Sequence, residues 1–94
     1  MNTITIHVYY TCKSGQAGAF VQAVKDSGIQ EKIRAEEGCL RYDYYLSCEA
    51  PDTVLLAEQW QSAAAQERHM AQPHMAQLRK LKEEYTVETK LEQY

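Results

Sequence analysis

The sequence has no long hydrophobic run, and its apolar stretches extend over only a few residues. A helix that crosses a membrane needs about 20 mainly apolar residues, so a membrane-spanning segment is not expected. The first ten residues, MNTITIHVYY, also lack the basic region and long apolar core of a signal peptide. We therefore expect a cytoplasmic protein with no membrane partner.

The sequence also has no excess of positive charge. Ten Lys and Arg against 13 Asp and Glu give a net charge of −3, which argues against a nucleic-acid partner. Cysteine is scarce and odd in number, with three residues and no C-x-x-C pair, which argues against a disulfide framework or a zinc knuckle. We expect Cys12, Cys39 and Cys48 to be free thiols.

The length and the hydrophobic periodicity indicate one small α+β domain over residues 1–94. A domain of this size is only marginally stable alone, and oligomerisation is one remedy. Alternating apolar and polar residues predict strands, with β-branched and aromatic types dominating the first. The expected strands are residues 3–11, 39–48, 53–61 and 84–94, the last carrying Tyr85, Val87, Thr89 and Leu91 on one face.

Two amphipathic helical segments separate these strands. Ser14 is the N-cap candidate of the first, Gly28 interrupts it, and residues 29–35 are expected to form a short second piece. Ser62 is the N-cap candidate of the other helical segment. Pro73 either kinks that helix or begins a new one.

The resulting order is β-α-β-β-α-β, which is typical of a ferredoxin-like antiparallel sheet with its helices on one face. Several strands carry apolar or aromatic residues on both faces, for example residues 39–48 with Leu40, Tyr42, Tyr44 and Leu46 on one. The uncovered face would then need a partner, and a two-fold dimer is the commonest solution. We predict a homodimer in which two sheets pack face to face.

Three motifs resemble a known family. The stretch AEEGCLRYDYYLS is similar to the E-x-G-C-x-x-Y signature of the antibiotic biosynthesis monooxygenase family. LLAEQWQS with His69 nine residues after Trp60 resembles its E-x-W strand end, and Pro73-His74 resembles its proline–histidine pair. The resemblance implies a dimeric α+β barrel and a small-molecule pocket between sheet and helices. Its members include quinol and anthrone monooxygenases without metal or flavin, haem-degrading enzymes and isomerases.

Haem degradation is disfavoured because the haem-degrading members have three features that this sequence lacks. Its first strand has His7-Val8-Tyr9 where those members have an Asn. His69 stands where they have a Trp, and Arg79 lies about where their axial His falls.

The histidines are the candidate catalytic residues. His69 and His74 lie five apart across a proline rather than four apart on one helix, and His7 is the only other His. We therefore expect no metal, and the resemblance to monooxygenases without metal or flavin implies no other cofactor. Oxygenation without a cofactor needs a base near neutral pH to form an electron-rich substrate anion, and His69 or His74 suits this role. Arg41 or Arg79 could stabilise the anion.

The candidate substrate-binding residues are mainly aromatic, since aromatic walls hold a flat compound. They are Tyr42, Tyr44, Glu58, Trp60 and His7. Each also has a structural interpretation: Trp60 as core, the two tyrosines as dimer contacts, Glu58 in a buried ion pair, and His7 as packing.

The functional hypothesis is a cofactor-independent monooxygenase that oxidises a small aromatic or quinol-type compound with dioxygen. Two alternatives stay open. One is an isomerase that acts on a small carbonyl compound, which needs the same base but no oxygen. The other is a non-catalytic dimer that binds a small ligand.

Overall fold

A computed structural model describes residues 3–94 of the chain. Four strands and four helices follow one another, and each of the two expected helical segments is divided into two pieces. The elements are β1 (Ile4–Cys12), α1 (Ala17–Ser27), α2 (Ile29–Arg34), β2 (Cys39–Leu46), β3 (Thr53–Trp60), α3 (Ala63–Met70), α4 (His74–Tyr85) and β4 (Thr86–Gln93).

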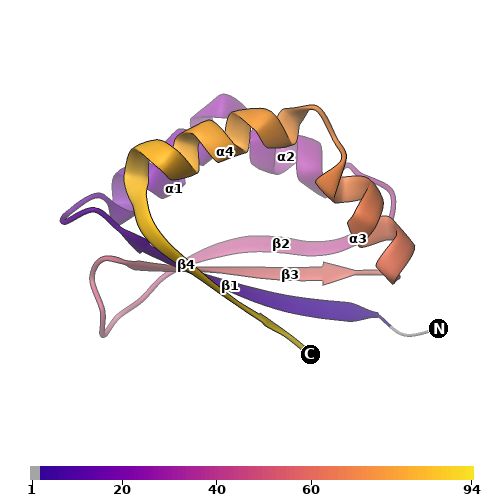
Figure 1. Ribbon diagram of the computed structural model, residues 1–94, viewed down its shortest axis with the longest axis horizontal. Coiled ribbons are helices and arrows are strands. Elements are labelled where there is room, and N and C mark those ends of the chain that lie inside the picture. The colour runs from indigo at the N-terminus through magenta and orange to yellow at the C-terminus, as the bar shows by residue number, and fades with distance from the viewer. Residues whose placement is uncertain (1–2) are drawn as a thin grey trace.

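The strands form one antiparallel sheet in the order β2-β3-β1-β4. In Figure 1 the helices lie together above the sheet, and the C-terminal end of the chain lies below them. The order and the layering confirm the ferredoxin-like α+β fold. Val8 at the centre of β1 pairs with Leu56 of β3 and Leu91 of β4, so these three side chains share the face toward the helices.

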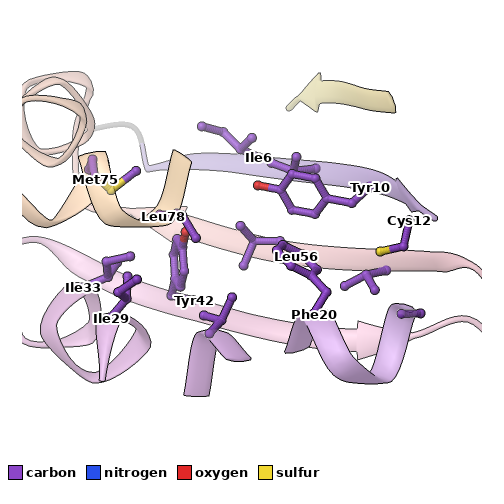
Figure 2. Close-up of a cluster of buried hydrophobic side chains, with 14 of the residues drawn as sticks. Ile6, Tyr10, Cys12, Phe20, Ile29, Ile33, Tyr42, Leu56, Met75 and Leu78 are labelled. Carbon is purple, nitrogen blue, oxygen red and sulfur yellow. The ribbon is translucent and has the colours of Figure 1, made fainter. Parts of the chain in front are cut away.

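The core lies between the sheet and the helices. Alternate residues of β1 are buried, as the period of a strand requires, and Val54, Leu56, Glu58 and Trp60 of β3 share the same buried face. Figure 2 shows Tyr10, Tyr42 and Leu56 from the strands, with Phe20 and Leu78 from the helices, pointing into this layer.

Two of the local signals at the helix ends, Ser62 and Gly28, are confirmed. The Ser62 hydroxyl accepts a hydrogen bond from the Ala65 amide at 3.2 Å and caps α3. Gly28 ends α1 with φ of 80°, a left-handed conformation that glycine adopts at little cost. Pro73 does not kink a continuous helix. It precedes the first residue of α4, a separate helix.

Three local predictions are wrong. The first helix begins after Gln16, because a turn closed by a bond from Gln16 N to Lys13 O holds Ser14 outside it. Tyr85 is the last residue of α4 rather than a strand residue, and its ring packs toward Phe20. Leu40 is exposed, because the β2–β3 register shifts between Cys39 and Arg41.

The opposite face of the sheet carries a mixed surface. Tyr9, Leu55 and Tyr45 contribute apolar area to it, and no helix of residues 3–94 lies on this side (Figure 1). None of the helices in the described part of the chain has the length and apolar character needed to cross a membrane.

Candidate active site

A pocket of about 100 Å³ lies between the sheet and the helices α3 and α4. Its wall is mostly apolar, with Val8, Met75, Leu78 and Leu91 among the lining residues. Leu91 is 60% exposed although it faces the helical side of β4, so the pocket is open along this strand.

Five ionisable side chains line the pocket: Tyr10, Tyr42, Glu58, His69 and Lys82. They come from β1, β2, β3, α3 and α4, so every one of these elements contributes one group. Such a convergence of polar groups in an apolar concavity is typical of a ligand site.

Glu36, in the turn between α2 and β2, joins the two candidate histidines. His74 Nε2 lies 2.7 Å from Glu36 Oε2, and His69 Nδ1 lies 3.2 Å from both carboxylate oxygens. The Glu36 side chain is only 10% exposed. Because a carboxylate only accepts hydrogen bonds, both of these ring nitrogens donate to it. When the His69 ring is neutral, its lone pair is therefore on Nε2.

His69 is held firmly in this position. It is 2% exposed, its ring lies 4.5 Å from that of Trp60 at an interplanar angle of 31°, and Tyr42 contacts it edge-on at 5.8 Å. Burial lowers the pKa of His69 below 6.5, against the opposing effect of the Glu36 carboxylate. The ring is therefore neutral near physiological pH, and its Nε2 has no hydrogen-bond partner in residues 3–94.

Glu58 is the second carboxylate of the site. It is 7% exposed, and its Oε1 accepts a hydrogen bond from Trp60 Nε1–H at 3.0 Å. Burial raises the pKa of Glu58 above 4.5, while the Trp60 bond and the nearby Lys82 charge act in the opposite direction. A carboxyl group with a raised pKa and an imidazole with a lowered pKa, both lining one pocket, are typical of acid–base sites.

The other residues expected at the site are placed differently. Trp60 supports His69 and Glu58 from within the core, and His74 contacts Glu36 rather than the pocket. The Tyr44 hydroxyl is buried without a hydrogen-bond partner in the described chain. His7 is not brought to this cluster: it lies on the opposite face of the sheet, with its ring 4.9 Å from that of Tyr94.

Sequence reasoning missed Glu36 and Lys82. Glu36 is the first residue of the E-x-G-C motif, which was the only sign of it. Lys82 follows Met75 and Leu78 at helical spacing, so it shares their inward face. The two arginines expected to stabilise the anion lie elsewhere: Arg41 is near Asp43 on the edge strand β2, and Arg79 is outside the pocket lining.

Comparison with known proteins agrees with this architecture. The sequence profile described as antibiotic biosynthesis monooxygenase matches residues 3–81, which is most of the chain. The chain belongs to the antibiotic biosynthesis monooxygenase family.

Individual relatives extend this result. The Escherichia coli K12 protein named "Probable quinol monooxygenase YgiN" is 38% identical over 64 residues, which cover 57% of this chain and 62% of that protein. The crystal structure of PA3566 from Pseudomonas aeruginosa has a TM-score of 0.86 at 26% identity and covers 100% of this chain and 93% of that one. The crystal structure of SO0527 from Shewanella oneidensis has a TM-score of 0.83 at 26% identity and covers 98% of this chain and 88% of that one.

Proposed function

We propose that the chain is a cofactor-independent monooxygenase that oxidises a small aromatic or quinol-type compound with dioxygen. The observation that carries the proposal is His69, a buried imidazole on an apolar pocket, whose Nδ1 is held by the Glu36 carboxylate. Family membership and the quinol monooxygenase relative support the reaction class.

In the proposed reaction His69 acts as the general base, and Glu36 is a positioning residue. Nε2 of His69 takes the proton of a substrate hydroxyl while Glu36 keeps the proton on Nδ1. The electron-rich anion passes one electron to dioxygen, and the two radicals combine to form a carbon–oxygen bond. Loss of water from the resulting hydroperoxide leaves a hydroxyquinone, so one quinol and one dioxygen give one hydroxyquinone and one water.

The size of the pocket favours a substrate with a single aromatic ring. Its volume of about 100 Å³ is somewhat smaller than the roughly 150 Å³ cavity that encloses benzene in another protein. A single ring therefore fills the enclosed part of the pocket. Naphthalene- or anthrone-sized rings require side-chain movement.

Oxygen consumption with reduced benzoquinones, naphthoquinones and anthrones tests the proposal. We expect turnover above the rate without enzyme, fastest with one ring, and a loss of about 10²–10⁴-fold in His69→Gln. Arg68→Gln, an exposed change on the same helix, is the matched control and should keep full activity. Turnover without oxygen would refute oxygenation and indicate an isomerase. Absence of turnover with every substrate would refute the enzymatic proposal.

We also propose that residues 1–94 form one domain that pairs as a homodimer through the sheet face opposite the helices. Tyr9, Leu55 and Tyr45 give this face an aromatic and aliphatic centre, which favours burial against a second copy. Leu55→Asp should yield a folded monomer by light scattering, whereas Gln77→Asp on the exposed side of α4 should not. A wild type that is monomeric at micromolar concentration would contradict the pairing.

A further inference from the structure

Lys82 stands out among the pocket residues because its positive charge has no counter-ion there. The side chain is half-buried and lines the pocket, with Nζ 5.8 Å from the ring centroid of Tyr10. Within residues 3–94, no carboxylate oxygen lies within 4.0 Å of this ammonium group. An ammonium group on an apolar wall is costly unless an anion approaches it.

Glu58 is the nearest candidate for a counter-ion, but the geometry keeps it apart. Its Oε1 is already bonded to Trp60 Nε1–H, and both Glu58 and Lys82 line the same pocket without forming an ion pair. A ligand oxygen in this space would meet the ammonium group directly. The other charges near Lys82 are Arg79, whose effect opposes protonation, and Glu58, whose effect favours it; burial acts with Arg79 to lower the Lys82 pKa.

We propose that Lys82 binds the ionised oxygen of the substrate, so that the pocket selects phenol- or quinol-type compounds as their anions. This inference rests on the proposed function, because it supplies the group that stabilises the anion formed when His69 removes the proton. His69 on α3 and Lys82 on α4 reach the pocket from separate helices. Proton acceptor and anion partner are therefore different groups, and the Lys82 charge stays in place while the proton passes to His69.

A second role is open to Lys82 on purely structural grounds. Lys82 also lines an open groove between α4 and β4, and its methylene chain can contribute apolar contact alone. In that case the charge would be irrelevant to ligand binding, and only packing would suffer from a substitution. The test must therefore report on the charge of the ligand rather than on stability or turnover.

The probe is 4-nitrophenol, a single ring that ionises near neutral pH and whose anion absorbs visible light. Bound to the wild-type protein, it should ionise at lower pH than in water and bind at least tenfold more tightly than 4-nitroanisole, its neutral methyl ether. A tenfold preference corresponds to about 1.4 kcal/mol. Because this comparison uses the unmodified protein, it does not depend on whether any variant folds. Failure to bind the phenol, or equal affinity for both probes, would overturn the proposal.

Substitutions then assign the effect. Lys82→Met should abolish the preference for the anion and restore the ordinary ionisation of the probe, while Lys82→Arg should keep both. Lys80→Met is the matched control, because Lys80 is exposed on the same helix and carries the same charge. An unchanged preference in a folded Lys82→Met protein would refute the role of Lys82.

The two proposals fail in different ways. The probe measures binding alone, whereas oxygen consumption with quinols measures the reaction. Selective binding of the phenolate without any quinol turnover would support the anion-binding role of Lys82 and refute the monooxygenase proposal. Quinol turnover without phenolate selectivity would keep the oxygenase and refute the role of Lys82.

Discussion

Replacing Glu36 with glutamine is the most informative perturbation of the site. The carboxylate accepts hydrogen bonds from His74 Nε2 at 2.7 Å and His69 Nδ1 at 3.2 Å, and only 10% of its side chain is exposed. In Glu36→Gln an amide oxygen at the Oε2 position still accepts from both histidines, but the negative charge is lost and the amide N–H then faces the Nδ1–H of His69. His69 must then share one neutral acceptor with His74 or change its tautomer.

The expected loss of stability follows from the hydrogen bonds that Glu36 makes to the two histidines. A hydrogen bond to a charged group contributes about 1.5–3 kcal/mol, and an unpaired buried donor costs about 1–3 kcal/mol. In a domain of this size each kcal/mol lowers Tm by about 4–8 °C, which calorimetry resolves easily. Glu37→Gln is the matched control, since Glu37 is the exposed neighbour of Glu36, and its Tm should change little.

The catalytic consequence is larger. If Glu36 no longer keeps the proton on Nδ1 of His69, the lone pair is not held at Nε2, and kcat should fall by up to about 10²–10⁴-fold with a small change in KM. The Glu36 charge raises the pKa of His69 against the effect of burial. Its removal lowers that pKa further, so the acidic limb of the kcat/KM profile should move to lower pH.

The result that would refute this reasoning is a folded Glu36→Gln protein with the wild-type kcat and an unshifted acidic limb. In that case His69 would not depend on Glu36 for its tautomer. Nitrogen NMR of the imidazole provides the direct check, because it distinguishes a protonated Nδ1 from a protonated Nε2 in both proteins.

Further predictions concern stability and reactivity. Burial raises the pKa of Glu58 above 4.5, so the stability linked to its proton is present below pH 4.5 and is lost as the pH rises through the folded-state pKa. Glu58→Gln should therefore raise Tm at pH 8 and hardly at pH 4, and an equal gain at both would contradict the assignment. In native protein at pH 8, mass spectrometry should find alkylation at the exposed Cys48 and little at Cys39, whose pKa burial raises to about 11; equal labelling would refute this. Gly38→Ala should cost about 1–3 kcal/mol in urea unfolding and more than Gly28→Ala, since both have positive φ but a Cβ at Gly38 would lie 2.5 Å from a neighbouring side chain.

Much of the fold could be predicted from the sequence because the relevant signals are local. Strand alternation depends on the geometry of single residues, so Leu56, Glu58 and Trp60 could be assigned to one face of β3. Ser62 and Gly28 act on the helix ends beside them. The boundary at Tyr85 was less accessible, because the alternation that suggested a strand begins inside the last turn of α4.

The candidate site depended on contacts that no local pattern reports. His69 was recognised as a candidate by its residue type and spacing. Glu36, however, is 33 residues from His69 and 38 residues from His74 in the sequence, although it contacts both. These contacts require the α2–β2 turn, α3 and α4 to pack together over the sheet. The sequence by itself therefore determined the elements and the inventory of reactive groups. Only the tertiary structure decided which groups converge, placing Lys82 in the pocket and His7 on the opposite face, because convergence is set by how separate elements pack.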